Sequence, residues 1–331
     1  MDSTPKVTLA DVAQRAGVSV ATVSKVINGR YGVSRATIAR VHEAVADLGF
    51  DSGLEAIRGR APRTRAVAVL ATGIDATVAE YVKGVATGLE DTGYRLHVHT
   101  GGPDHGWERK ALAQLAGTFA DGAIVIGPTV VNASTSIPTV GIDPHHRFTP
   151  RPTVASDVYG GIELATRHLL ELGHRRLAFV GGRHDLESAR RGEAAFRDAL
   201  EEAGIACDDD LIAQAEQSPR RAARAVEAMI AFDAPPTAVV AATDPMAIAV
   251  MEAALDAGLT VPADLSIVGF GGVPEACTAP VPLTTVRQPL QEMGIEAARM
   301  LLERIGGAEP AGPHVTMPVE LVVRESTAPP R

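Results

Sequence analysis

Residues 8–28, TLADVAQRAGVSVATVSKVIN, constrain the fold of this chain more than any other stretch. Apolar side chains recur in its first half at helical spacing, namely Leu9, Val12, Ala13 and Ala16. This spacing predicts a helix over 9–16. Thr8, followed three residues later by Asp11, is typical of a capped helix start, and Gly17 can adopt the positive φ that ends a helix. We therefore expect a short helix that stops at a tight turn.

Two further helices are predicted after this turn. Ser19 is a suitable N-cap for a helix over 20–27. Its inward positions are Val23 and Val26 or Ile27, and its outward positions are Val20, Ala21, Ser24, Lys25 and Asn28. A third helix is predicted from Ser34 to Gly49, because Ile38, Val41, Val45 and Leu48 form one apolar face. Helices this short must share one small core.

A helix-turn-helix pair can place its second helix in the major groove of DNA. The charge agrees: residues 1–65 carry ten basic and six acidic side chains, a net charge of +4, so the remainder carries −13 to reach the total of −9. A basic head on an acidic body confines attraction to phosphate to the head. The alternative is an ordinary three-helix bundle, because this geometry also occurs in proteins that bind no nucleic acid.

The head resembles that of the LacI/GalR family of transcriptional regulators, without a gap, in GVSVATVSKVING and VSRATIARVHEAVADLGF. The resemblance implies a homodimer that binds a pseudo-palindromic operator in double-stranded DNA. Val20, Ala21 and Lys25 occupy the family's base-reading positions. Lys25 can donate to guanine, although the family more often has arginine there, and the other two offer apolar contact. The predicted phosphate contacts are Thr8, Ser19, Thr22, Ser24, Asn28 and Ser34.

Residues 51–65, DSGLEAIRGRAPRTR, are rich in Gly and Arg, which predicts a linker. In the family this stretch forms a hinge helix, and a leucine from it wedges into the minor groove. Ala56 matches the family's alanine, but Gly59 stands at the leucine position, so Leu54 or Ile57 is expected to take that role. The alternative is a disordered basic linker.

From residue 66 short apolar runs alternate with amphipathic segments. The first series predicts the strands AVAVLA, YRLHVH and GAIVIG with helices over about 80–92 and 107–116. The second predicts the strands RLAFVGG, TAVVAA and SIVGFGG with helices over about 160–172, 189–203, 220–231 and 246–257. This alternation is typical of two doubly wound α/β units, each with a mostly parallel sheet.

The body also resembles the family, whose bodies have the periplasmic-binding-protein fold, in LATRHLLELGHRRLAFVGG, TAVVAATDPMAIAVMEAA, VPADLSIVGF and PLTTVRQPLQEMGIEAARMLLERI. The resemblance implies a head over 1–50, a hinge over 51–65 and an effector-binding and dimerisation domain over 66–331. The expected N-subdomain covers about 66–157 and 288–318, and the C-subdomain about 158–287 and 319–331, with crossings near Asp157, Arg287 and Val319. The effector is expected between them, at the carboxyl ends of the strands.

The ligand region departs from the sugar-responsive members of the family. Those members hydrogen-bond sugar hydroxyls with an arginine, an asparagine and an aspartate, where this chain has Gly192, Thr243 and Gly271. Either the effector differs from an ordinary monosaccharide, or the body has lost its response and only dimerises. The predicted effector-binding residues are Tyr81, Trp107, Asp143, Asp185, Arg190, Arg191, Thr243 and Asp244. Trp107 could stack on a sugar ring or simply cap the core.

The sequence contains no GxSxG, GxGxxG, P-loop or HExxH motif, and we expect neither an enzyme nor a cofactor. His97 and His99 share a strand face, but no neighbouring Cys or carboxylate completes a metal set. Cys207 and Cys277 lack CxxC spacing. The sequence has no apolar run long enough to span a membrane and no signal-peptide core, which predicts a cytoplasmic protein without a membrane partner.

These features together predict a sequence-specific transcriptional regulator, expected to be a repressor. A small molecule between the subdomains, expected to be a sugar or oligosaccharide, would modulate its affinity for the operator. One alternative is a solute-binding protein with a similar body, which the attached head argues against. The other is a regulator that has lost its effector response.

Overall fold

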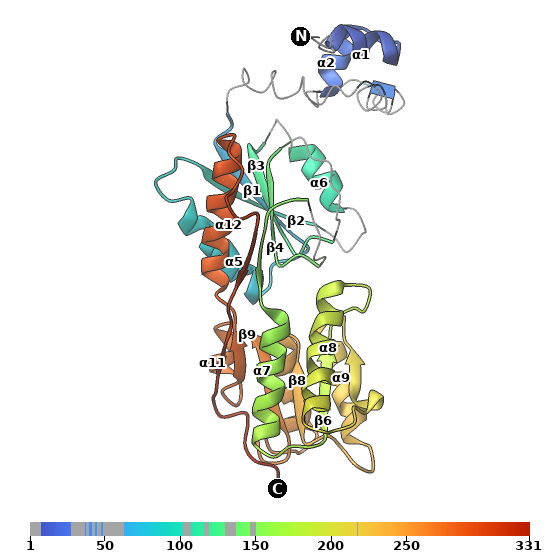
Figure 1. Cartoon of the computed structure of the whole chain (residues 1–331), viewed down its shortest axis with the longest axis vertical. Helices are drawn as coiled ribbons and strands as arrows, with labels where there is room; N and C mark the ends of the chain where they lie inside the picture. The colour runs from blue at the N-terminus through green and yellow to red at the C-terminus, as the bar shows by residue number, and fades with distance from the viewer. Residues whose placement is uncertain are drawn as a thin grey trace.

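The computed structural model describes residues 8–27, 37, 40–41, 44, 48, 63–101, 107–115, 119–129, 137–145, 150–216 and 218–331. A small helical head is followed by an α/β body made of two lobes, each built on a six-stranded sheet (Figure 1). This architecture confirms the predicted fold class. Within the described ranges no helix combines the length and apolar character needed to cross a membrane.

The head contains α1 (Leu9–Ala16) and α2 (Val20–Ile27), with the bounds that the sequence predicts. Val12 and Val23 are fully buried between the two helices. Val41 and Ala44, from the third predicted helix, complete this core. As predicted, Val23 and Val26 of α2 face inward and Val20, Ala21 and Lys25 face outward, whereas Ser24, predicted outward, is half-buried.

The first sheet has the order β11-β5-β4-β3-β1-β2, and all its strands are parallel. Its strands are β1 (Ala66–Ala71), β2 (Arg95–Thr100), β3 (Gly122–Ile126), β4 (Thr139–Ile142), β5 (Thr153–Ser156) and β11 (His314–Met317). Helices α5 (Ala76–Gly88) and α12 (Leu290–Ile305) cover one face, and α6 (Trp107–Leu115) packs on the other. Strand β1 is buried on both sides: Val67 and Val69 face α5 and α12, whereas Ala68 and Leu70 face α6.

The second sheet has the order β12-β10-β9-β8-β6-β7. Its strands are β6 (Leu177–Gly181), β7 (Ile212–Gln214), β8 (Ala238–Ala241), β9 (Ser266–Gly271), β10 (Thr284–Arg287) and β12 (Glu320–Val322). Only the pairing of β12 with β10 is antiparallel in this sheet. Helices α7 (Val158–Glu171) and α8 (Glu187–Glu202) cover one face, and α9 (Pro219–Ile230) and α10 (Asp244–Asp256) cover the other. The short helices η1 (Asp209–Leu211) and α11 (Glu275–Thr278) lie in connections.

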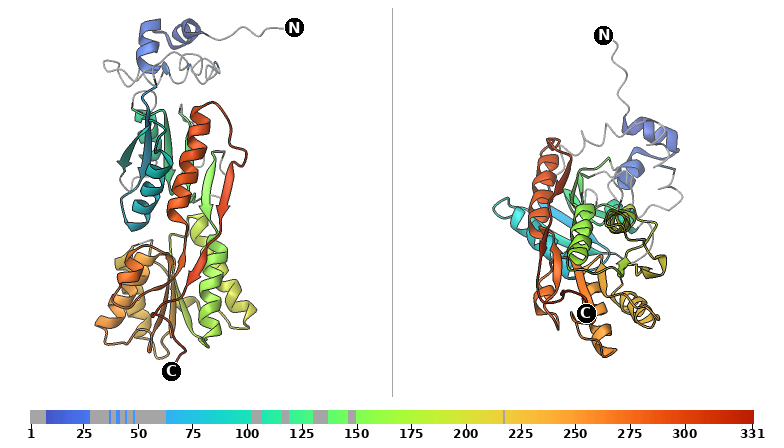
Figure 2. Two further views of the ribbon diagram at one scale, coloured as in Figure 1. Left: turned by 90° about the vertical axis from the view of Figure 1, so that its left-hand side faces the viewer. Right: turned by 60° about the horizontal axis from the view of Figure 1, so that its bottom comes forward.

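The lobes lie end to end, and α12 and α7 belong to different lobes (Figure 2). The chain crosses between the two sheets after Ser156, after Arg287 and between Met317 and Glu320. These crossings bring the carboxyl ends of the parallel strands toward the junction of the lobes.

The predicted helix bounds in the body differ from the observed ones by a few residues. The helix expected over about 80–92 is α5, which begins at Ala76 because the Asp75 carboxylate accepts a hydrogen bond from Val78 N at 2.8 Å. The residues after Gly88 form turns. Strands such as β4, β7 and β12 are only three or four residues long, which is too short to produce a clear periodic pattern.

Candidate functional site

The start of α1 is held by a reciprocal cap. Thr8 N and Thr8 Oγ1 donate to Asp11 Oδ2 at 2.7 and 2.6 Å, and Asp11 N donates to Thr8 Oγ1 at 3.4 Å. The hydrogen bonds from Thr8 lower the pKa of Asp11. Gly17 ends the helix at φ 64°, where Val18 N donates to Ala13 O at 3.0 Å. These contacts set the turn between the two helices.

The side of α2 that faces away from the core carries the predicted base-reading residues. Val20 is 46% exposed, and Ala21 and Lys25 are also exposed. Ser19 Oγ accepts from Thr22 N at 3.1 Å and lies 2.8 Å from Thr22 Oγ1. One of these two hydroxyls donates to the other, so one hydroxyl proton remains available for a phosphate oxygen.

The other residues predicted to contact phosphate differ in whether their side chains are free to do so. The Thr8 hydroxyl donates to Asp11, and Ser24 is half-buried. Asn28 and Ser34 lie outside the described residues, as do all the predicted hinge residues, Leu54, Ala56, Ile57 and Gly59. Thr22 and Ser19 are therefore the best-placed candidates within the described part of the head.

Tyr81 and Asp143, both predicted to bind an effector, bond to each other where the lobes meet. Tyr81 is 2% exposed, and its hydroxyl donates to Asp143 Oδ2. Asp143 Oδ1 accepts from Ser156 N at 2.9 Å, and Gln288 Nε2 donates to Asp143 Oδ2 at 3.1 Å and to Ser156 Oγ at 2.6 Å. Burial, together with the charge of Asp143, raises the pKa of Tyr81 well above its usual value. We call Tyr81, Asp143, Ser156 and Gln288 the crossing cluster.

The crossing cluster links the two lobes directly. Ser156 ends β5 immediately before the first crossing, and Gln288 follows β10 at the second. While its side chain reaches Asp143, Gln288 N donates to Gly271 O in the other lobe at 3.0 Å. The sequence patterns did not identify Ser156 or Gln288 as site residues. Their positions as polar residues directly at predicted crossings were the available signal.

Asp244 is fully buried in the second lobe. Its Oδ2 accepts from Gly272 N at 2.6 Å and from Val273 N at 2.9 Å, and its Oδ1 accepts from Thr285 Oγ1. Burial raises the pKa of Asp244, although these three donors oppose that shift. Both carboxylate oxygens are engaged within the fold, so Asp244 stabilises the turn after β9 and does not face a ligand.

The three departures from the sugar-responsive pattern have different structural settings. Gly271 has φ 136°, and a Cβ there would lie 3.3 Å from Asp244 Oδ2, so an aspartate would meet both backbone strain and charge repulsion. Thr243 caps α10, and its hydroxyl accepts from Met246 N at 3.4 Å. Gly192 is buried in the interior of α8, where a Cβ would meet Ile162 at an ordinary 3.7 Å.

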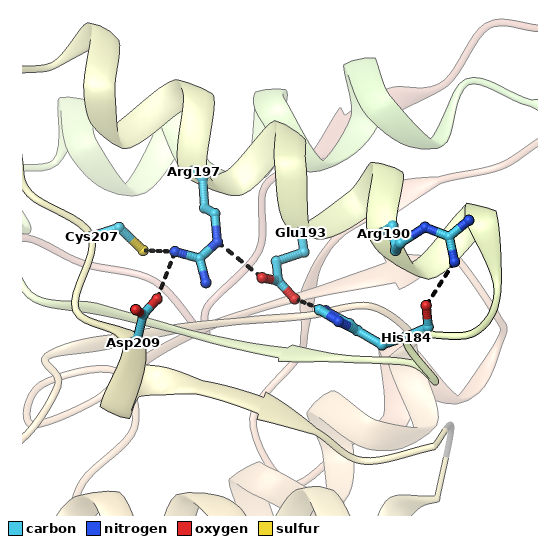
Figure 3. A network of polar contacts seen from close by, with 6 residues as sticks. All are labelled: His184, Arg190, Glu193, Arg197, Cys207 and Asp209. Atoms are coloured by element: carbon cyan, nitrogen blue, oxygen red, sulfur yellow. Dashed lines mark hydrogen bonds and ion pairs between the residues drawn. The ribbon is translucent and has the colours of Figure 1, made fainter.

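Arg190 and Asp185 hold the turn before α8. Arg190 donates to His184 O at 2.7 Å, and Arg183 Nε donates to Asp185 Oδ1 at 2.9 Å. Further along the helix, Glu193 bridges His184 and Arg197 (Figure 3). Arg197 continues this network to Asp209 at 2.7 Å and to Cys207 Sγ at 3.4 Å.

Arg191 and Trp107 remain as candidates for ligand contact. Arg191 is half-buried, and no hydrogen-bond or ion-pair partner for it occurs among the residues that the structure describes. The Trp107 ring packs closely against Gly101, where an added Cβ would lie 2.0 Å from Trp107 Cε3, and against the core beside α6. Trp107 therefore covers the core, which is the alternative to stacking on a sugar ring.

A direct bridge between the lobes lies at the start of α8, which has no side-chain cap of its own. Glu187 N donates to His145 O at 3.1 Å, and His145 Nδ1 lies 2.8 Å from Ser188 Oγ. His145 follows β4 in the first lobe, so one lobe supplies the cap for a helix of the other. No pattern in the sequence marks His145 as a site residue, because only the tertiary fold brings it to α8.

Comparisons with known proteins agree with this architecture. Residues 8–52 match the family described as "Bacterial regulatory proteins, lacI family", and residues 166–327 match "Periplasmic binding protein-like domain". The HTH-type transcriptional regulator DegA of Bacillus subtilis (strain 168) is 33% identical, over 98% of this chain and 99% of that protein. The HTH-type transcriptional repressor PurR of Pectobacterium carotovorum subsp. carotovorum (strain PC1) is 31% identical, over 97% of each chain.

Two solved structures extend the similarity to three dimensions. A transcriptional regulator CelR–cellobiose complex has a TM-score of 0.72 and 30% identity, and the match covers 97% of this chain and 99% of that one. A lac repressor dimer bound to operator and the anti-inducer ONPF also has a TM-score of 0.72, with 26% identity, 98% of this chain and 100% of that one. The relatives are transcriptional regulators and not enzymes. Since head and body match together over nearly the whole length, this chain belongs to the LacI family of bacterial transcriptional regulators.

Proposed function

We propose that the protein is a repressor that binds a pseudo-palindromic operator as a homodimer and that a small molecule held between its lobes modulates this binding. The observation that carries the DNA part is the exposed side of α2. There Val20, Ala21 and Lys25 face away from a core that buries Val23. Such a helix can enter the major groove and present these side chains to base edges. We also propose a cytoplasmic location, because an operator-binding protein must have access to the chromosome.

The DNA part is tested by fluorescence anisotropy with a duplex from the region upstream of the protein's own gene and with a scrambled duplex. We expect tighter, salt-sensitive binding to the native duplex. Lys25→Ala should cost about 1 to 3 kcal/mol and relax the preference at one base pair. Lys110→Ala, which removes an exposed lysine from α6, is the matched control. Unchanged sequence preference in the Lys25 variant would contradict this docking.

The proposed phosphate contacts have a separate test. Thr22→Val removes the hydroxyl that lies beside Ser19, and it should weaken binding to native and scrambled duplexes alike, because phosphate carries no sequence information. A loss confined to the native duplex would contradict this assignment. Thr22→Ser keeps a hydroxyl and should bind like the unmodified protein.

We propose that the effector is a sugar or oligosaccharide held by Arg191 and Thr243, with Trp107 at the edge of the site. Arg191 supports this role because it is a half-buried cation, without a partner in the described part of the chain. The relative solved with cellobiose makes an oligosaccharide a sensible first probe. We propose an indirect role for Asp244, Tyr81 and Asp143: they support the walls of the site without contacting the ligand, since their polar atoms bond within the fold.

Isothermal titration calorimetry with cellobiose and a panel of monosaccharides tests the effector part. Arg191→Ala should weaken binding by about 1.5 to 3 kcal/mol, the range for a hydrogen bond to a charged group. Arg190→Ala is the control, because Arg190 already donates to His184 O. A protein that binds operator but no sugar would support the alternative, a regulator without this response.

The dimer proposal rests on β2, an edge strand of the first sheet. Its six residues are mostly exposed, including Val98 at 40%. An exposed edge strand leaves backbone N–H and C=O groups free to pair with another chain, and Val98 adds an exposed apolar side chain to this edge. Light scattering after size exclusion should give a dimer, and Val98→Lys should shift it toward monomer. A monomer in the unmodified protein at micromolar concentration would contradict the proposal.

A further inference from the structure

Asp121 connects the linker to the body. It lies immediately before β3, and its Oδ1 accepts from Thr64 N at 2.9 Å and from Thr64 Oγ1 at 2.8 Å. Its Oδ2 accepts from Arg65 N at 3.0 Å, and its own N–H donates to Ala66 O at 2.8 Å. One carboxylate thus binds the last two linker residues before β1.

The backbone turns sharply at this contact. Arg65 has φ 49°, in the left-handed region that non-glycine residues adopt only when their surroundings hold them there. Both of its backbone polar groups are bonded: its N–H donates to Asp121, and its carbonyl accepts from Arg95 N at 2.8 Å. The turn sets the direction in which the chain enters the sheet from the linker.

The residue before Thr64 contacts α12. Arg63 donates to Ile305 O at 3.2 Å, at the carboxyl end of that helix, where a cation is favourable. The other end of α12 starts at Leu290, two residues after Gln288 of the crossing cluster. A helix of 16 residues is about 24 Å long. One rigid element therefore reaches from the junction of the lobes to the place where the linker attaches.

We propose that Asp121 is a positioning residue that couples the body to the DNA-binding heads. It fixes Thr64 and Arg65 to the first sheet, while Arg63 bonds to the end of α12, so that movement at the crossing cluster reaches the linker as a rigid displacement. This inference rests on the proposed function, because it concerns how lobe movement changes operator binding. Without the Asp121 contacts, the linker would pivot at residues 63–65, and the heads would no longer follow the lobes.

The first experiment needs no DNA. Limited trypsin digestion of the full chain should cut slowly after Arg63 and Arg65, because Asp121 and its neighbours hold their backbone. Asp121→Ala removes all three hydrogen bonds to this carboxylate and should speed these two cuts by at least about tenfold, because losing even one hydrogen bond to a charged acceptor corresponds to a factor of about ten. Asp264→Ala is the matched control: Asp264 accepts from Thr260 N at 2.8 Å in the other lobe, and its removal should leave both cuts unchanged.

The second experiment measures coupling. Asp121→Ala should weaken operator binding about tenfold and reduce the change caused by effector, while effector affinity stays within about twofold of the unmodified protein. Thr64→Val, which loses one of the three bonds to Asp121, should give the same changes to a smaller extent, and Thr64→Ser should restore them. This milder pair tests the proposal even if Asp121→Ala folds poorly.

The outcomes separate the two proposals. Unchanged cleavage at Arg63 and Arg65 in both Asp121→Ala and Thr64→Val would overturn the role of Asp121. The role would also be overturned if Asp121→Ala bound the operator as tightly as the control Asp264→Ala. Failure of the unmodified protein to bind any operator would instead contradict the proposed function. In that case the digestion still decides whether Asp121 holds the linker.

Discussion

The two lobes share a doubly wound architecture but use a carboxylate at the junction in different ways. In the first lobe, Asp143 accepts from side chains of Tyr81 and Gln288, which come from distant parts of the chain. In the second lobe, Asp244 accepts mainly from backbone N–H groups of a glycine turn. One carboxylate therefore ties segments together across a crossing, whereas the other stabilises a single loop. Similar folds do not imply similar sites, because each site depends on local polar contacts.

The largest expected effect comes from Asp244. Asp244→Ala leaves Gly272 N, Val273 N and Thr285 Oγ1 without their acceptor in a buried region, and we expect the free energy of unfolding to fall by about 3 kcal/mol or more. Urea denaturation measures this loss. Asp264→Ala, which removes an exposed carboxylate, should cost much less. A stable Asp244 variant that only loses ligand affinity would break the comparison, because it would make Asp244 a ligand-binding group.

A smaller effect is expected in the crossing cluster. Tyr81→Phe removes the hydroxyl that donates to Asp143 but leaves Gln288 and Ser156 as donors, so unfolding should become easier by about 1 to 2 kcal/mol. Tyr159→Phe is a useful control, because its hydroxyl bonds to Asp198 at an exposed site. Equal losses of unfolding free energy in the two variants would show that the crossing cluster stabilises the fold no more than an exposed hydrogen bond does.

The contact across the lobes should be weaker still. His145→Ala removes the ring that lies beside Ser188, while the backbone carbonyl that caps α8 remains. We expect a loss of about 0.5 to 1.5 kcal/mol, the net value of one hydrogen bond. Small-angle scattering should also show a more open average arrangement of the lobes than in the unmodified protein. An unchanged scattering profile would mean that the crossings alone set the arrangement.

The smallest expected effect has the opposite sign. Gly192→Ala adds a methyl group at ordinary contact distance inside α8, and alanine is a better helix former than glycine, so stability should rise by about 0.5 to 1 kcal/mol. Thermal denaturation can detect the change. Gly84→Ala in α5 should instead be strongly destabilising, because its Cβ would lie 2.0 Å from Gln291 O. A destabilising Gly192→Ala would show that space at this position is needed.

The sequence predicted most of the architecture and much less of the ligand site. Helices α1 and α2 have the predicted bounds because their caps and apolar spacing are local signals. The site is different: Arg191 and Thr243 remain candidates for ligand contact, but Asp244 is enclosed by its own lobe and Arg190 by its own turn. Composition could not distinguish these cases, because a cleft carboxylate and a buried structural one look alike along the chain.

By itself the sequence determined the helix-turn-helix head, the alternation of strands and helices and the separation of charge between head and body, since each depends on neighbours within a few turns of the chain. Only the tertiary structure decided which polar groups meet. Gln288 reaches Asp143 across 145 residues of sequence, His145 reaches α8, and Asp121 reaches Thr64. Buried polar atoms must find partners, and those partners are supplied by whichever distant segments the packing of the sheets brings together.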